Sequence, residues 1–122
     1  MKRFLAFLAL ASLFAASALA HSTLDRSEPK DGAVLKQAPN DIRMWFTEPL
    51  KVQLSTIEVR DAAGKQVDRR DLRADEKQPT LLHLSLLPAI EPGTYKVSWS
   101  AVAQDLHVSK GSFNFRVAAE RK

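Results

Sequence analysis

Residues 94–102 read TYKVSWSAV and residues 111–117 read GSFNFRV, and these two stretches decide the fold. In both, apolar and polar residues alternate, so that every second side chain falls on the same face of an extended chain. Each stretch is therefore predicted to be a half-buried β-strand. The apolar face of the pair carries these residues: Tyr95, Val97, Trp99, Phe113, Phe115 and Val117.

Shorter stretches of the same kind lie upstream, separated by turn clusters rich in proline, glycine and aspartate. Residues 33–38 are expected to be irregular. Helical periodicity is almost absent, and the spacing of the strands predicts an all-β fold, a seven-stranded antiparallel Greek-key barrel or sandwich of the immunoglobulin-like kind. The expected strands are residues 22–26, 42–47, 54–60, 66–70, 80–86, 94–102 and 111–117.

The predicted core follows from the apolar faces of these strands. Residues 68–76 mix arginines with acidic residues and are predicted to be a solvated loop rather than a recognition patch. Besides the six residues of the last two strands, the expected core residues are Leu24, Ile42, Met44, Phe46, Ile57, Val59, Leu82, Leu84 and Leu86.

Residues 1–20 are predicted to be a cleaved secretory signal peptide. A short basic start is followed by an apolar run that extends to Phe14, and Ala18-Leu19-Ala20 is typical of a cleavage site. The apolar run is too short for a membrane span. Cleavage leaves residues 21–122 as a single domain, for which we expect a periplasmic location and a monomer.

Composition excludes several classes of function. Without Lys2 and Arg3, the cleaved chain keeps 16 of the 18 basic residues and all 14 acidic ones, so its net charge is +2. Such a small positive charge argues against a nucleic-acid partner in an exported protein. The chain has no cysteine, which excludes disulfides, thiolate catalysis and thiolate metal sites. It also lacks a Gly-x-Ser-x-Gly elbow and a glycine-rich phosphate loop.

His21 is the most informative residue, because cleavage after Ala20 makes it the new amino terminus. An N-terminal histidine offers its α-amine and its imidazole Nδ1 to the same metal ion. The α-amine has an ordinary pKa of about 7.7–8.0, so a metal competes there with a weakly held proton. Such nitrogen donors suit Cu(II). The alternative is that the cleavage site precedes a histidine by chance.

Asp105 and His107 form a second candidate pair in the connection between the two strongest strands. Side chains two residues apart share a face of an extended segment, so a carboxylate and an imidazole can meet one ion. The alternative is a local hydrogen bond in an exposed loop. His83 is predicted to be a surface or hydrogen-bonded strand histidine, and Met44 a core residue rather than a thioether ligand.

The chain has His21-Ser22-Thr23-Leu24 followed by Ser-Glu-Pro-Lys-Asp-Gly at residues 27–32, and Phe46-Thr47-Glu48-Pro49 after an apolar strand. With these motifs, essentially all of residues 21–117 resembles the CopC/PcoC family of periplasmic copper-binding proteins. The family shows the similar motifs His-x-x-Leu, Ser-x-Pro-x-x-Gly and Phe-Ser/Thr-Glu-Pro. Three further family motifs correspond to residues 93–99, 105–107 and 111–117: Gly-x-Tyr-x-Val-x-Trp, Asp-Gly-His and Gly-x-Phe-x-Phe-x-Val.

The resemblance implies a Greek-key β-barrel or sandwich whose Cu(II) is held by His21, Asp105 and His107. It implies a copper carrier or buffer in copper homeostasis or resistance, not an enzyme, whose partner is a membrane copper transporter or another periplasmic copper protein. Leu106 stands where the family has glycine, so we expect the loop to lose access to positive φ. The methionine-rich loop of some members is absent, which implies a Cu(II)-only protein.

Two other functions stay open at this point. An amine plus two imidazoles is also the ligand set of the histidine-brace copper oxygenases, although the chain shows no obvious aromatic platform for a polysaccharide. A metal-free β-sandwich that serves as an interaction module would bind no copper tightly.

Overall fold

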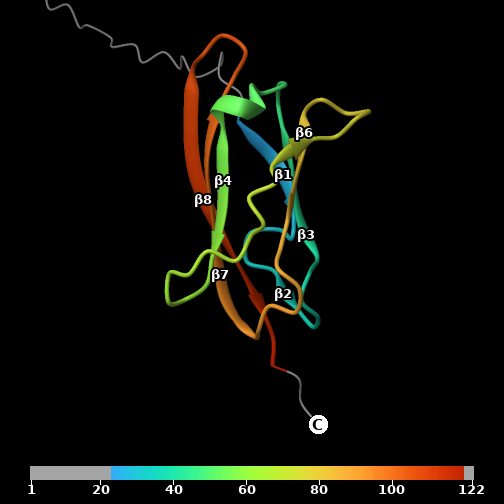
Figure 1. Cartoon of the computed structure of the whole chain (residues 1–122), viewed down its shortest axis with the longest axis vertical. Coiled ribbons are helices and arrows are strands. Elements are labelled where there is room, and N and C mark those ends of the chain that lie inside the picture. Colours follow the sequence, from blue (N-terminus) through green and yellow to red (C-terminus); the bar gives the residue numbers. More distant parts are fainter. Residues whose placement is uncertain (1–22, 120–122) are drawn as a thin grey trace, which may run out of the picture.

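The computed structural model describes residues 23–119, which form two four-stranded β-sheets packed on one another (Figure 1). The predicted signal peptide and His21 lie outside these residues. No helix within 23–119 has the length and apolar character needed to cross a membrane. In spatial order, the first sheet contains β1 (Leu24–Glu28), β3 (Asp41–Phe46), β6 (Leu81–Ser85) and β5 (Arg73–Ala74). The second contains β2 (Val34–Leu35), β8 (Val108–Val117), β7 (Gly93–Val102) and β4 (Thr56–Arg60).

The β-sandwich prediction is confirmed, with three local corrections. Residues 33–38 are not wholly irregular, because β2 pairs with β8, and in parallel rather than antiparallel orientation. The charged stretch at 68–76 contains the two-residue strand β5, which pairs with β6. Residues 66–70 do not form a strand, because this segment leaves one sheet for the other. A pattern of two residues carries too little periodicity to predict β2 or β5.

The core lies between the sheets and contains the residues that the strand periodicity predicts. Thirteen of the fifteen predicted core residues are buried, and Leu24 and Trp99 are half-buried against them. Met44 is 1 % exposed, which fits a packing role. The rings of Tyr95 and Phe115 stack with centroids 5.4 Å apart, and Trp99 contacts Phe46 edge-on. Burial of each large apolar side chain stabilises the fold by roughly 1.5–3 kcal/mol.

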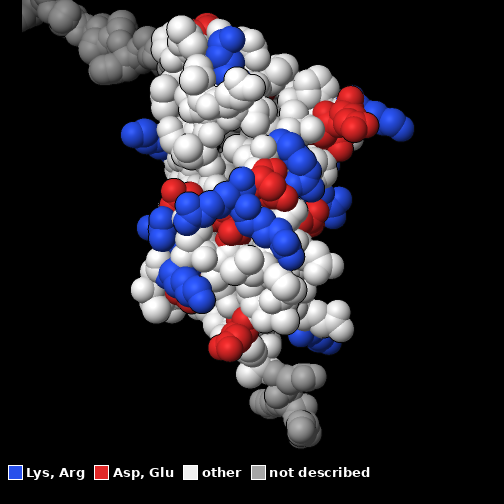
Figure 2. Space-filling model, viewed as in Figure 1, with Lys and Arg blue, Asp and Glu red and all other residues white. Residues whose placement is uncertain are grey.

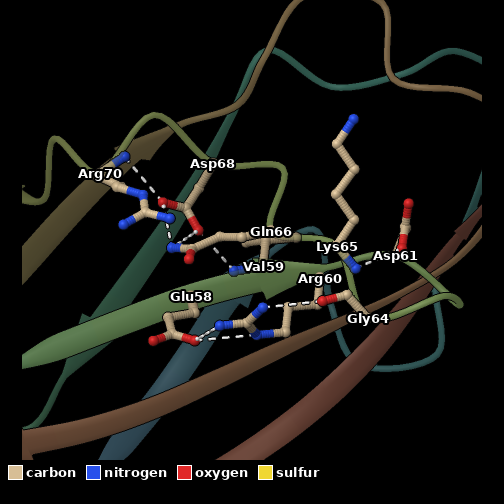
Figure 3. Close-up of polar contacts among 9 residues, drawn as sticks. All are labelled: Glu58, Val59, Arg60, Asp61, Gly64, Lys65, Gln66, Asp68 and Arg70. Carbon is tan, nitrogen blue, oxygen red and sulfur yellow. Dashed lines mark hydrogen bonds and ion pairs between the residues drawn. The ribbon is translucent and has the colours of Figure 1, made fainter.

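Asp68 is a buried carboxylate at the crossover between the sheets. Its Oδ2 accepts hydrogen bonds from the Val59 backbone N–H, at 2.9 Å, and from Gln66 Nε2, at 3.0 Å (Figure 3). Its Oδ1 accepts the Arg70 N–H at 2.9 Å, where Arg70 has a φ of 59°. Asp68 itself is 5 % exposed and bridges to Leu86 beside β6. The carboxylate thus ties β4 to the segment of residues 66–70, while the backbone of Asp68 pairs with Leu86 next to β6.

Asp68→Ala is expected to lower the free energy of unfolding by about 2–4 kcal/mol, because the buried N–H of Val59 loses its acceptor. Urea denaturation followed by circular dichroism measures the loss. The matched control is Asp61→Ala, which removes hydrogen bonds to Ala63 and Lys65 in an exposed turn. This control should lose less than about 1 kcal/mol. Equal losses in the two variants would contradict the role given to Asp68.

Candidate metal centre

The β7–β8 hairpin carries Asp105 and His107 at its tip. Its two ten-residue strands pair along their full length, from Gly93 opposite Val117 to Val102 opposite Val108. Two backbone hydrogen bonds close the tip, from Leu106 N to Ala103 O at 2.9 Å and from Ala103 N to His107 O at 3.0 Å. Ala103 is 1 % exposed, so the tip is anchored on the core.

Leu106 adopts a φ of 72°, so the expectation that the loop loses positive φ is wrong. The left-handed region costs a residue with a side chain about 1–2 kcal/mol. The hydrogen bond that Leu106 N donates to Ala103 O belongs to this tight turn and helps to hold the conformation. The hairpin therefore keeps a left-handed residue between Asp105 and His107 although glycine is missing.

Asp105 and His107 contact each other. The imidazole Nδ1 lies 3.0 Å from Asp105 Oδ2, and the His107 backbone N–H donates to Asp105 Oδ1 at 3.1 Å. The side chains are 48 % exposed for Asp105 and 56 % for His107. If Nδ1 carries the proton that faces the carboxylate, the lone pair of the neutral ring lies on Nε2, which is then the nitrogen suited to a metal.

The start of β1 lies at the same end of the sandwich as this hairpin tip (Figure 1). Thr23 is fixed to Thr47 by two hydrogen bonds of 2.9 Å, and Leu24 pairs with Phe46 at the end of β3. Leu24 also lines a cavity of about 300 Å³ together with Trp99 of β7 and other residues of β1 and β8. The chain therefore enters the described fold beside the hairpin, two residues after His21.

The described residues supply part of a metal site. No three histidine or acidic side chains within residues 23–119 lie close enough together to hold a metal ion. Asp105 and His107 are the predicted ligands that the structure brings together, whereas His21 is outside the described range. The three-residue site therefore stays a prediction.

His83 has a partner elsewhere, as expected for a hydrogen-bonded strand histidine. Its Nε2 lies 2.8 Å from Asp75 Oδ1, and the ring is 19 % exposed. The hydrogen bond with His83, followed by the backbone N–H of Lys77, lowers the pKa of Asp75 below its ordinary value. His83 thus serves as a control histidine for metal binding.

The outer surface formed by residues 23–119 offers no second group of metal-ligating side chains. Trp45 faces outward, and the Arg26 guanidinium lies 3.6 Å from its ring centroid. Arg73 of the mixed-charge stretch pairs with Asp71 at 3.0 Å. On the face shown in Figure 2, Lys and Arg side chains lie among Asp and Glu, which fits a solvated surface.

Ser55 is a buried structural residue that the sequence pattern did not reveal. It is 7 % exposed, and its hydroxyl donates to Lys51 O and accepts the N–H of Val102, both at 2.9 Å. These bonds join the last residue of β7 to the 3-10 turn η2 (Val52–Leu54). A lone serine among strand and turn residues gives no signal for such a contact.

Comparisons with known proteins agree on one family. The CopC domain matches residues 24–118. Copper resistance protein C of Xanthomonas campestris pv. juglandis is 35 % identical over 112 residues, which cover 88 % of this chain and 87 % of that protein.

Two crystal structures share the fold at 24 % identity. CopC of Methylosinus trichosporium OB3b has a TM-score of 0.76, with 84 % of this chain and 98 % of that chain covered. PcoC of Escherichia coli, described as a methionine-rich copper resistance protein, has a TM-score of 0.71, with 80 % and 98 % covered.

Proposed function

The chain belongs to the CopC family of copper resistance proteins, and from that premise we propose that it is a periplasmic carrier or buffer for Cu(II). Copper is its cargo, and one Cu(II) per chain is held by His21, Asp105 and His107. The observation that carries this proposal is the contact between Asp105 and His107 at the hairpin tip, at the end of the sandwich where β1 begins.

The reach of the amino terminus supports the proposed ligand set. Thr23 is hydrogen-bonded to Thr47 at the end of the sandwich that carries the β7–β8 tip, and one residue separates Thr23 from His21. Each extended residue spans at most about 3.3–3.6 Å, so the cleaved terminus starts within roughly 7 Å of Thr23. Removal of residues 1–20 by signal cleavage is part of the proposal, since it creates the α-amine that the ion requires.

The donor chemistry favours Cu(II) as the cargo. An amine and two imidazoles are nitrogen donors of the kind that divalent copper prefers, and Asp105 adds a carboxylate or orients His107 through Nδ1. Soft sulfur ligands would be needed for tight Cu(I) binding. The only methionine after residue 20 is Met44, which is buried in the core. The crystal structure of PcoC, by contrast, is described as that of a methionine-rich protein.

We propose a carrier rather than an oxygenase. Asp105 brings a carboxylate next to His107, so the ion would have little open coordination for dioxygen. The outward-facing ring of Trp45 is covered by the Arg26 guanidinium, 3.6 Å from its centroid, and so offers no free aromatic platform.

Titration of the mature protein, beginning at His21, tests the proposal. We expect one tightly bound Cu(II) per chain, measured by competition with a Cu(II) chelator, and no tight Cu(I) binding in the same format. Apo protein should already be folded, and copper should raise its melting temperature by mass action. Absence of tight Cu(II) binding, or sub-micromolar binding of Cu(I), would overturn the proposal.

A further inference from the structure

A short segment joins the two halves of the proposed metal centre. After β3 ends at Phe46, the chain crosses the end of the sandwich to η2, close to the tip of the β7–β8 hairpin (Figure 1). We call residues 47–51, which make this crossing, the linking segment. It begins with Thr-Glu-Pro at residues 47–49, a motif that the sequence singles out and that the proposed ligand set leaves unused.

Thr47, at one end of the linking segment, holds the start of β1. Its Oγ1 accepts the backbone N–H of Thr23, and its own backbone N–H donates to Thr23 O, both at 2.9 Å. In a regular antiparallel ladder the second acceptor would be a backbone carbonyl. Here it is a hydroxyl, so the hold on Thr23 depends on which side chain stands at position 47.

Leu50, near the other end of the linking segment, contacts the hairpin tip. It is 6 % exposed and forms an antiparallel bridge with Ala103. The next residue, Lys51, donates its N–H to Val102 O at 2.8 Å. Ala103 in turn donates its N–H to His107 O at 3.0 Å. Backbone contacts therefore lead from the linking segment to His107.

The linking segment is short and has little freedom. Two residues, Glu48 and Pro49, separate Thr47 from Leu50, and the ring of Pro49 holds its φ at about −65°. A proline also pushes the residue before it toward extended conformations. Few backbone angles can therefore change between the two anchors, and the separation of the start of β1 from the hairpin tip is nearly fixed.

We propose that the linking segment sets the spacing between the two halves of the Cu(II) site, and that Thr47 is the residue that positions His21. This inference rests on the proposed function. His21 comes two residues before Thr23 in the sequence, so the two bonds from Thr47 limit the volume that the α-amine and the imidazole can reach. Binding then loses less conformational freedom than it would with an unanchored terminus.

The bond from the Thr47 hydroxyl should matter more for copper than for folding. Thr23 and Thr47 are both exposed, so water can replace the hydroxyl as the acceptor of the Thr23 N–H, and the apo fold loses little. Water does not hold Thr23 against the end of β3, so the placement of His21 is lost. A fall in Cu(II) affinity without a matching fall in apo stability therefore separates positioning from a purely structural role.

Thr47→Val tests the proposal, because valine keeps the shape of threonine and the backbone N–H but removes the hydroxyl. We expect the mature protein to lose about tenfold in Cu(II) affinity, the lower end of the loss for groups that orient metal ligands. The melting temperature of the apo protein should fall by less than about 3 °C. Thr47→Ser restores the hydroxyl and should restore the affinity.

Thr94→Val is the matched control. Thr94 is also an exposed threonine of a strand, but it lies opposite Arg116 near the other end of the β7–β8 hairpin. Competition with a Cu(II) chelator should give this variant the affinity of the wild type.

The same substitution in the background of His107→Ala separates positioning from direct binding. The nitrogen donors left there, the α-amine and the imidazole of His21, belong to one residue and need no placement against the hairpin. Thr47→Val should then weaken binding by at most about twofold, because residues that act together are not additive.

Three outcomes would overturn the inference. One is unchanged Cu(II) affinity in Thr47→Val, and another is a loss that Thr47→Ser does not restore. The third is an equal loss with and without His107, which would show that Thr47 acts independently of the hairpin. Failure of the proposed function is recognised earlier, in the wild type, as the absence of one tightly bound Cu(II).

Discussion

One extra residue before His21 is expected to lower the Cu(II) affinity of the mature protein by on the order of 100-fold or more, which corresponds to about 2.7 kcal/mol of binding free energy. The extension turns the α-amine into an amide that no longer offers a lone pair to the ion at neutral pH. The imidazole of His21 is still present, so the loss isolates the amine. The proposed site thus depends on the position of the cleavage, after Ala20.

Competition with a Cu(II) chelator compares the native terminus with a form that retains a methionine before His21. The control is the melting temperature of both apo proteins, which should be equal because the extension lies outside the core. Affinity of the native form should also fall as pH decreases, since protons compete for the amine and both imidazoles. Equal affinities of the two forms would exclude the amine and leave an ordinary two-histidine site.

His107→Ala is expected to weaken Cu(II) binding at least tenfold more than Asp105→Ala. Removal of the imidazole removes a nitrogen ligand, which Cu(II) prefers over a carboxylate. Removal of Asp105 leaves the imidazole in place but takes away the carboxylate oxygen that lies 3.0 Å from its Nδ1. Loss of such an orienting group costs about 10–100-fold in affinity.

His83→Ala is the matched control for this pair of variants. It also removes one histidine, but from a strand position where the ring contacts Asp75. Competitive titration of all three variants should give wild-type affinity for His83→Ala. A larger loss for His83→Ala than for His107→Ala would show that the copper lies on the outer face of the first sheet.

The long strands could be predicted from the sequence because their burial repeats every second residue. Burial alternates in β8 over residues 111–117 and in β7 over residues 94–97, whereas Ala101 and Val102 at the end of β7 are both buried. The crossover at residues 66–70 shows the same apolar and polar mixture without being a strand. There, Asp68 accepts hydrogen bonds from backbone groups of both β4 and its own segment. Such a tertiary contact produces no periodic pattern in the sequence.

The candidate site was predictable to the extent that it is local in the sequence. Asp105 and His107 are two residues apart and do contact each other, but in the turn of the hairpin, not in the extended segment from which their contact was predicted. The conformation of Leu106 was mispredicted, because intrinsic preference favours glycine at positive φ and the turn of the hairpin overrides it. Nor could the pattern show that Ser55 joins η2 to β7.

Electron paramagnetic resonance of the mature protein with one equivalent of Cu(II) tests the central claim most directly, because the nitrogen superhyperfine splitting reports how many nitrogen atoms are bound to the ion. The account predicts three nitrogens, from the α-amine, the imidazole of His21 and the imidazole of His107. His107→Ala should reduce the count to two, whereas His83→Ala should leave it at three. A spectrum of hydrated Cu(II), or a three-nitrogen pattern that persists in His107→Ala, would contradict the proposed site.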